Sequence, residues 1–181
     1  MILRAAISTD VEALLEVQQP AAVQGLGHIF PQDQHPFPRE AIASRWLTEI
    51  ADPDVSVYLY ADDDGSIQGF AAIRSHELLH FGTALHTWGT GLASHFHDAL
   101  LDATARAHGT PTLTLRVFEE NLSARRFYEK HDWQPTGRTS RTTFPPHPML
   151  LQYERHLVDV SLDVRATAPR KRRCADPGPG V

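Results

Sequence analysis

The stretch Trp88-Gly89-Thr90-Gly91-Leu92-Ala93 decides which fold this chain of 181 residues is expected to adopt. Two glycines stand directly before a segment of helical periodicity, 92–107, so the N–H groups of the turn should point outward at a helix N-terminus. Such groups, together with the helix dipole, bind phosphate. Glycine pairs before helices also serve tight packing, and neither a Walker A continuation nor the third glycine of a dinucleotide loop follows. The stretch alone leaves both interpretations open.

The segments around this loop alternate between helical and strand patterns. The β-rich TLTLRVF at 112–118 and a helix at 123–131 follow the glycine-led helix. Upstream, two β-rich runs flank Asp-Asp-Asp-Gly within 55–75, which is typical of a hairpin. Further expected elements are a strand at 2–7, a helix from Asp10 that ends at Pro20, a helix at 40–50, and strands at 141–144 and 149–157. Interleaved strands and helices predict an α/β sheet covered on both faces.

The order of these features resembles the GNAT superfamily of N-acetyltransferases. The family's central motif, Gln/Arg-Gly-x-Gly-x-Gly/Ala, is matched by residues 88–93. Its later Asn-x-x-Ala-x-x-x-Tyr is matched by Asn121-Leu-Ser-Ala124-Arg-Arg-Phe-Tyr128. The match is specific over 77–137 and looser over 2–76 and 138–157. The resemblance implies one GNAT-like acyltransferase domain over 1–157, with a mixed, mostly antiparallel twisted sheet and helices on both faces.

The resemblance also implies an activity: transfer of an acetyl group from acetyl-CoA, as co-substrate, to a primary amine of a small molecule by direct attack, with no metal. Such a reaction needs a proton acceptor for the amine and an acid for the departing thiolate. Tyr128 matches the family's thiolate-protonating tyrosine, and Glu77 matches the strand glutamate that often acts as base, directly or through water. The residues implied in cofactor binding are Thr83, Trp88, Gly89, Thr90, Gly91, Leu92, Ala93, Asn121 and Arg125.

Each of these residues also has a plain structural interpretation. Tyr128 fits as a packed ring, Glu77 as a solvated strand residue, Asn121 as a helix cap and Arg125 as a solvating helix residue. The chain departs from the family pattern at Trp88, which stands in place of Gln or Arg. It departs again at Asp132, which stands where glycine is usual and tolerates a left-handed backbone better than most residues.

A long loop, 25–38, is the expected entry of the acceptor. It contains three prolines and several rings, and ordered loops of this length are often binding loops. Its candidates for holding a cationic amine are His28, Phe30, Asp33 and His35.

A rival interpretation comes from His76-Glu77-Leu78-Leu79-His80, an H-E-x-x-H string. On a helix it would place two imidazoles on one face for zinc with Glu77 as general base, which would make the protein a zinc metallohydrolase. In a regular strand, His76 and His80 would share one face and Glu77 would point to the other. The H-E-x-x-H interpretation explains nothing in the region 88–133.

The amino-acid composition limits the classes of partner that this protein is expected to bind. The chain has 17 basic and 22 acidic residues, a net charge of −5, which disfavours a globally basic nucleic-acid binder. Its single cysteine, Cys174, cannot form an internal disulfide, and no run approaches the roughly 18 apolar residues of a membrane span. These features indicate a cytoplasmic protein with no membrane contact, and they allow a homodimer.

The last segment, 158–181, differs from the rest in charge and composition. It holds five basic and three acidic residues and is rich in proline and glycine, which predicts a disordered, locally basic tail. Because such a tail can touch nucleic acid, an acyl-carrier-protein or aminoacyl-tRNA donor on the same fold stays open as an alternative.

Overall fold

The computed structural model describes residues 1–108 and 112–157 and contains one seven-stranded sheet over these residues. The strand order is β1-β2-β3-β4-β5-β7-β6, and every neighbouring pair is antiparallel except β4 and β5. The strands are β1 Ile2–Ala5, β2 Val55–Ala61, β3 Ile67–Arg74, β4 Glu77–Thr83, β5 Thr112–Phe118, β6 Gln134–Arg141 and β7 Met149–His156. The helices are α1 Val11–Leu26, α2 Arg39–Ala51, α3 Leu92–His108 and α4 Leu122–Lys130. The predicted mixed, mostly antiparallel sheet is confirmed.

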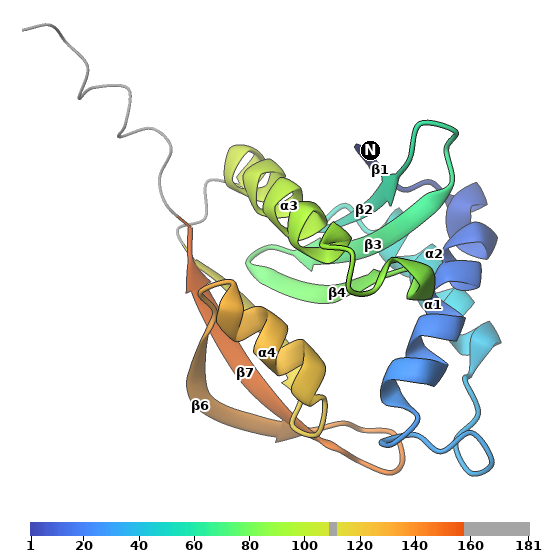
Figure 1. Cartoon of the computed structure of the whole chain (residues 1–181), viewed down its shortest axis with the longest axis vertical. Coiled ribbons are helices and arrows are strands. Elements are labelled where there is room, and N and C mark those ends of the chain that lie inside the picture. Colours follow the sequence, from blue (N-terminus) through green and yellow to red (C-terminus); the bar gives the residue numbers. More distant parts are fainter. Residues whose placement is uncertain (109–111, 158–181) are drawn as a thin grey trace, which may run out of the picture.

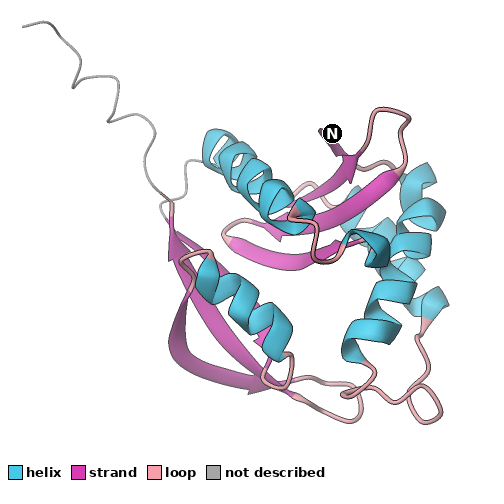
Figure 2. Ribbon diagram, in the orientation of Figure 1, coloured by secondary structure: helices cyan, strands magenta, loops and turns pink. Residues whose placement is uncertain are grey.

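Each face of the sheet has its own apolar core, because the strands alternate their side chains between two helix layers. On one face, Phe96 and Leu100 of α3 and Tyr128 of α4 pack with Leu113 and Leu115 of β5. Figure 2 shows α3 over the β1–β4 half of the sheet and α4 over the β5–β7 half. The second core joins α1 and α2 to the opposite face; its largest buried members are Leu14, Leu15, Trp46, Leu59 and Phe70. Helices therefore cover both faces, as predicted.

The parallel pair in the middle of the sheet is very short. β4 and β5 are in register only at Glu77 with Thr114 and at Leu78 with Leu115. Beyond these residues the strands separate, and Figure 1 shows β1–β4 and the β6–β7 pair as two distinct halves. We call the separated segments, 79–83 of β4 and 116–118 of β5, the β4–β5 fork. Within the part of the chain that the structure describes, backbone groups of the fork lack a strand partner on their inner side.

A β-bulge lies at the base of the fork and changes which side chains share a face. Ala72 pairs with His80 while the next residue, Ile73, pairs with Leu78, so Leu79 is an extra residue in β4. Leu78 belongs to the α3–α4 core, whereas His80 contacts Trp46 of α2. Glu77 and His80 consequently lie on the same face, toward α2. The regular alternation expected for this strand, with Glu77 and His80 on opposite faces, is wrong because the bulge interrupts it.

Two expected boundaries are also wrong. The first helix does not end at Pro20 but continues to Leu26, with an exposed Pro20 inside it. A proline within a helix costs one hydrogen bond and a steric clash, about 3 kcal/mol; the burial of Leu14 and Leu15 in the same helix offsets it. The first strand of the final pair is β6 Gln134–Arg141 rather than 141–144, because β7 pairs with it from Gln134 onward.

The predicted tail, 158–181, lies outside the described residues, so the domain boundary at 157 stays a prediction. Within the described residues, no helix combines the length and apolar character needed to cross a bilayer.

Candidate active site

The glycine loop between β4 and α3 presents unpaired backbone donors. Gly89 and Gly91 have φ of +78° and +89°, a left-handed backbone that glycine adopts without strain. Thr90 braces the turn: its Oγ1 donates to the Thr87 carbonyl (2.6 Å) and accepts from the Leu92 N–H (3.3 Å). Among the described residues, the N–H groups of Gly89, Gly91 and Ala93 have no acceptor. The loop can therefore donate to an anion at the α3 N-terminus.

Replacing Gly91 with Ala is expected to weaken CoA binding about tenfold. A side chain at a left-handed position costs about 1–2 kcal/mol, so the loop relaxes and must be reformed when the ligand binds. Isothermal titration calorimetry with CoA measures the change. Gly65→Ala is the matched control, because Gly65 has the same positive φ (+91°) in the distant β2–β3 turn. An unchanged affinity in Gly91→Ala would show that this loop does not hold CoA.

Trp88 ties the glycine loop to both β4 and α1. Its indole N–H donates to the Thr83 carbonyl (3.3 Å), and its ring lies 3.1 Å from the position that a Cβ on Gly25 would occupy. The side chain is 45% exposed. The residue that departs from the family pattern thus leaves the backbone donors free and braces the loop against α1.

At the end of β4, the backbone groups of every second residue point into the fork. The Ala84 N–H donates to the Gln68 carbonyl of β3, so by alternation the N–H of Gly82 also points toward β3. The backbone of Thr83 points the other way, away from β3 and into the fork. Its side chain is buried at 6% exposure. Thr83 therefore lies beside the glycine loop, and its predicted contact with the cofactor stays a prediction.

Tyr128 is buried on α4 between Phe127 and Trp133. Burial raises the pKa of its hydroxyl above the ordinary value of 10. The hydroxyl has no hydrogen-bond partner among the described residues. It is therefore a neutral donor at physiological pH that is not committed to another group.

Asn121 and Arg125 have structural contacts of their own. The Asn121 Oδ1 accepts from the Ala124 N–H (3.1 Å), which confirms that it caps α4. Arg125 donates from Nε to the Tyr153 hydroxyl (3.3 Å) and from Nη1 to the Glu119 carbonyl (3.0 Å). The Asn121 amide nitrogen and the Arg125 Nη2 are left for a ligand, and the cofactor contacts predicted for both residues stay predictions.

Glu77 lies at the closed end of the fork, on the α2 face. Its Oε1 accepts from the Arg116 Nε (2.8 Å), and the residue opposite it on β3 is Arg74, itself paired with Asp52. Arg116 was missed by sequence reasoning. The alternation of TLTLRVF puts it on the same face as Thr114, but only the parallel pairing of β4 and β5 reveals Glu77 as its partner.

The α1–α2 loop bridges the two halves of the molecule. His28 Nε2 contacts the Glu120 carbonyl (3.1 Å), and the Phe30 ring packs on Phe118 and Phe144 at centroid distances of 5.4 and 6.0 Å. Figure 1 shows the end of α1 and its following loop meeting the β6–β7 loop. His28 and Phe30 thus reach the open end of the fork. Asp33 is exposed within the loop, and within the described residues His35 makes only backbone hydrogen bonds inside the same loop, so neither is seen to contact the fork.

The zinc interpretation of His76-Glu77-x-x-His80 is wrong in its structural premise. Glu77 to Thr83 form a strand, not a helix, and His76 lies in the β3–β4 turn. The His80 Nε2 is hydrogen-bonded to Glu49 of α2 (2.9 Å) rather than directed toward His76.

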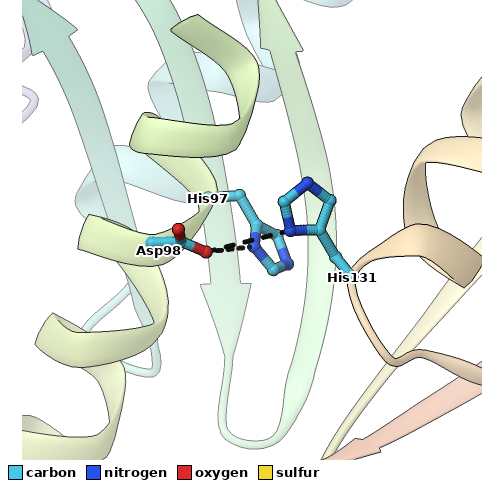
Figure 3. Close-up of side chains that lie close together, drawn as sticks. All are labelled: His97, Asp98 and His131. Carbon is cyan, nitrogen blue, oxygen red and sulfur yellow. Dashed lines mark hydrogen bonds and ion pairs between the residues drawn. The ribbon is translucent and has the colours of Figure 1, made fainter. Parts of the chain in front are cut away.

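A different cluster does gather metal-ligating atoms: His97 and Asp98 of α3 with His131 at the end of α4, all within 4.8 Å (Figure 3). The buried Trp133 indole donates to His97 Nε2 (2.9 Å), so this nitrogen carries the lone pair. The proton is then on Nδ1, which faces Asp98 Oδ1 at 3.2 Å. In this arrangement His97 has no free lone pair for a metal, and the cluster is a hydrogen-bonded network.

The family described as the acetyltransferase (GNAT) domain matches residues 1–134. No curated protein matches the chain.

Three solved structures share the fold at low sequence identity. The ribosomal-protein-S18-alanine N-acetyltransferase of Escherichia coli has a TM-score of 0.64 at 18% identity, over 86% of this chain and 93% of that one. Spermidine N-acetyltransferase of Vibrio cholerae in complex with CoA and spermine scores 0.66 at 14%, over 86% and 95%. An N-acetyltransferase of Staphylococcus aureus Mu50 scores 0.62 at 19%, over 86% and 98%. The chain belongs to the GNAT acetyltransferase family and is an acetyl-CoA-dependent N-acetyltransferase.

Proposed function

We propose that this enzyme acetylates a primary amine of a small, cationic molecule. The observation that carries the proposal is the arrangement around the β4–β5 fork. Unpaired amides of the glycine loop follow the tip of β4 at the open end of the fork, and the aromatic α1–α2 loop contacts the tip of β5 at the same end. A donor held beside the β4 arm and an amine entering beside the β5 arm would meet in the fork.

On the donor side, acetyl-CoA supplies an activated thioester. The amides of Gly89, Gly91 and Ala93 are the groups that would hold its pyrophosphate, since they are unpaired donors at a helix N-terminus. The Thr83 N–H, which points into the fork, is available to the acetyl carbonyl. Asn121 and Arg125 border the same opening from α4.

On the acceptor side, Phe30, Phe118 and Phe144 form an aromatic wall. Cations bind to aromatic faces and to carboxylates, and Glu77 lies at the closed end of the same face. The net charge of −5 also favours a cationic acceptor. We assign Glu77 to attracting the ammonium group.

The number of protons that the reaction moves indicates the role of Tyr128. An ammonium group that becomes an amide loses two protons from nitrogen: one goes to solvent through the proton acceptor, and the other replaces the acyl group on sulfur. Tyr128 donates its hydroxyl proton to the departing thiolate and is restored by the second nitrogen proton.

The structural neighbours support an amine acceptor without identifying it. One is bound to spermine and another is named for an alanine of ribosomal protein S18. A fork whose open end is bordered by an aromatic loop favours a small amine over a folded protein.

The test is thiol release from acetyl-CoA across a panel of polyamines, aryl-alkyl amines and an Ala-initiated peptide. We expect turnover with a small cationic amine, and we expect Phe30→Ala to raise KM for that amine about tenfold with CoA affinity unchanged, since it removes one wall of the entry. Leu47→Ala, an exposed position on α2, is the control. Turnover with the peptide alone would contradict the small-molecule assignment.

A further inference from the structure

One polar cluster contributes no group to the catalytic roles assigned above. Glu49 and Arg45 of α2 meet His80 of β4 in the otherwise apolar α1–α2 core. Glu49 Oε1 contacts His80 Nε2 at 2.9 Å and Arg45 Nε at 3.9 Å. The Trp46 ring packs edge-on against the imidazole at a centroid distance of 4.9 Å.

The cluster is incompletely satisfied. Glu49 is 8% exposed, and both its Oε2 and the Arg45 Nε are buried with no hydrogen-bond partner. A buried polar atom left unpaired costs about 1–3 kcal/mol. Groups kept at such a cost are often functional, since a packed apolar pair would serve α2 as well. Among the described residues, only Oε1 of the Glu49 carboxylate has a hydrogen-bond partner, and that partner is His80.

This bond sets the state of the imidazole. A carboxylate accepts only, so His80 Nε2 carries the proton and Nδ1 carries the lone pair. Nδ1 has no partner among the described residues and is not among the fully buried unpaired atoms. The His80 side chain is 19% exposed. An orienting carboxylate with a free imidazole nitrogen is the arrangement of a carboxylate–histidine base.

The position of the pair is what links it to the reaction. His80 stands in the separated part of β4, two residues beyond the last pairing with β5 at Leu78. The bulge at Leu79 turns His80 onto the face that also holds Glu77 and Arg116. This is the face on which the acceptor amine is proposed to enter.

We infer that His80 is the catalytic base of the transfer, with Glu49 as its positioning residue and Glu77 as the carboxylate that attracts the ammonium group. This assignment rests on the proposed function. The ammonium N–H bond breaks as the proton joins His80 Nδ1. The freed nitrogen pair forms the bond to the acetyl carbon while the carbon–sulfur bond breaks. Tyr128 protonates the departing thiolate and regains a proton from the nitrogen, which becomes the neutral amide, and His80 returns its proton to solvent.

The charges around His80 fit a base that is neutral at physiological pH. Burial lowers its pKa below 6.5, and the nearby Arg45 and Arg74 act in the same direction, while Glu49 raises it. Glu77 and Arg116 on the same face are paired with each other. We expect kcat of the wild type to fall as pH drops below 6.5 through the pKa of His80.

The test is steady-state kinetics against pH with the amine that the panel identifies. His80→Gln should lower kcat about 100-fold and abolish the acidic fall, with CoA affinity unchanged. His80→Ala should regain activity when imidazole is added. Glu49→Gln should keep the acidic fall but move it to lower pH, because the carboxylate that raises the pKa is gone. Glu77→Gln should raise KM for the amine and keep the fall.

His156→Gln, an exposed histidine on β7, is the control and should behave as wild type. If the cluster only holds α2 in place, the variants will unfold at lower temperature yet keep the acidic fall per folded enzyme, with no imidazole rescue, and the inference is overturned. Loss of the fall in Glu77→Gln alone would also overturn it. Absence of any CoA-dependent turnover in the wild type would instead overturn the proposed function.

Discussion

Replacing Tyr128 with Phe is expected to lower kcat for acetyl transfer about 100-fold while leaving KM for acetyl-CoA nearly unchanged. The substitution removes one hydroxyl from a side chain that is 8% exposed and keeps the ring contacts with Phe127 and Trp133. The hydroxyl has no partner within the described residues, so its loss breaks no hydrogen bond there. A large fall in kcat would therefore report the lost proton donor rather than altered folding.

The protonation state of Tyr128 is compatible with its role as the proton donor. Burial raises the pKa of the hydroxyl, so the donor stays protonated through the neutral range. The measurement is single-turnover thiol release with saturating amine, compared with Tyr60→Phe. Tyr60 is also buried in the α3–α4 core, stacked on Phe96, but lies on β2 away from the fork. If Tyr128→Phe retains kcat within about twofold, Tyr128 is a packing residue and another group protonates the thiolate.

The largest expected effect on stability comes from His97. Its side chain is fully buried, and its Nε2 accepts from the Trp133 indole N–H. Protonating Nε2 would set two N–H groups against each other in a dry site. Burial is the main cause that lowers the pKa of His97 from 6.5 to about 4, with the Asp98 hydrogen bond acting against it.

The sign of the pH effect follows from linkage. Between pH 6.5 and about 4 the unfolded chain binds a proton at His97 that the folded chain does not. The stabilisation is therefore complete above 6.5 and is lost as pH falls toward 4. The difference of the two pKa values corresponds to about 3 kcal/mol of unfolding free energy. Burial lowers the pKa of His131 as well, so it contributes in the same direction.

Urea unfolding at pH 7 and pH 4 measures this effect against the double variant His97→Phe/Trp133→Phe. The double variant removes the donor and the acceptor together, so neither is left unpaired. We expect it to lose about 3 kcal/mol less than the wild type on acidification. If both proteins lose the same amount of unfolding free energy between pH 7 and pH 4, His97 is protonated in the folded state at pH 4. His156→Gln controls for a generic histidine, since His156 is exposed.

Local sequence predicted the elements whose signals lie within a few neighbouring residues. The glycine pair at 89 and 91, the periodicity of α3 and the capping of α4 by Asn121 all depend on contacts within about one helical turn. The hairpin of β2 and β3 likewise needs only its own turn and alternation. These elements carry the family motifs, which is why the fold and the enzyme class could be predicted.

The contacts that shape the site join residues that are far apart in the sequence. The Arg116 bond to Glu77 joins residues 39 positions apart, and the His28 contact with Glu120 joins residues 92 apart. The Trp133 bond to His97 spans 36 positions and assigns the tautomer that the histidine adopts. No local pattern contains these pairings, because they form only when separate elements pack together.

The sequence by itself determined that a glycine turn precedes a helix in this chain, because left-handed glycines and helical periodicity act over short distances. Only the tertiary structure decided which side chains surround the fork. The bulge at Leu79 exists because β3 pairs on both sides of the extra residue, and it is this pairing that turns His80 onto the face of Glu77. The H-E-x-x-H sequence lies in a turn and a strand rather than a helix, because β4 pairs with β3 on one side and, at Glu77 and Leu78, with β5 on the other.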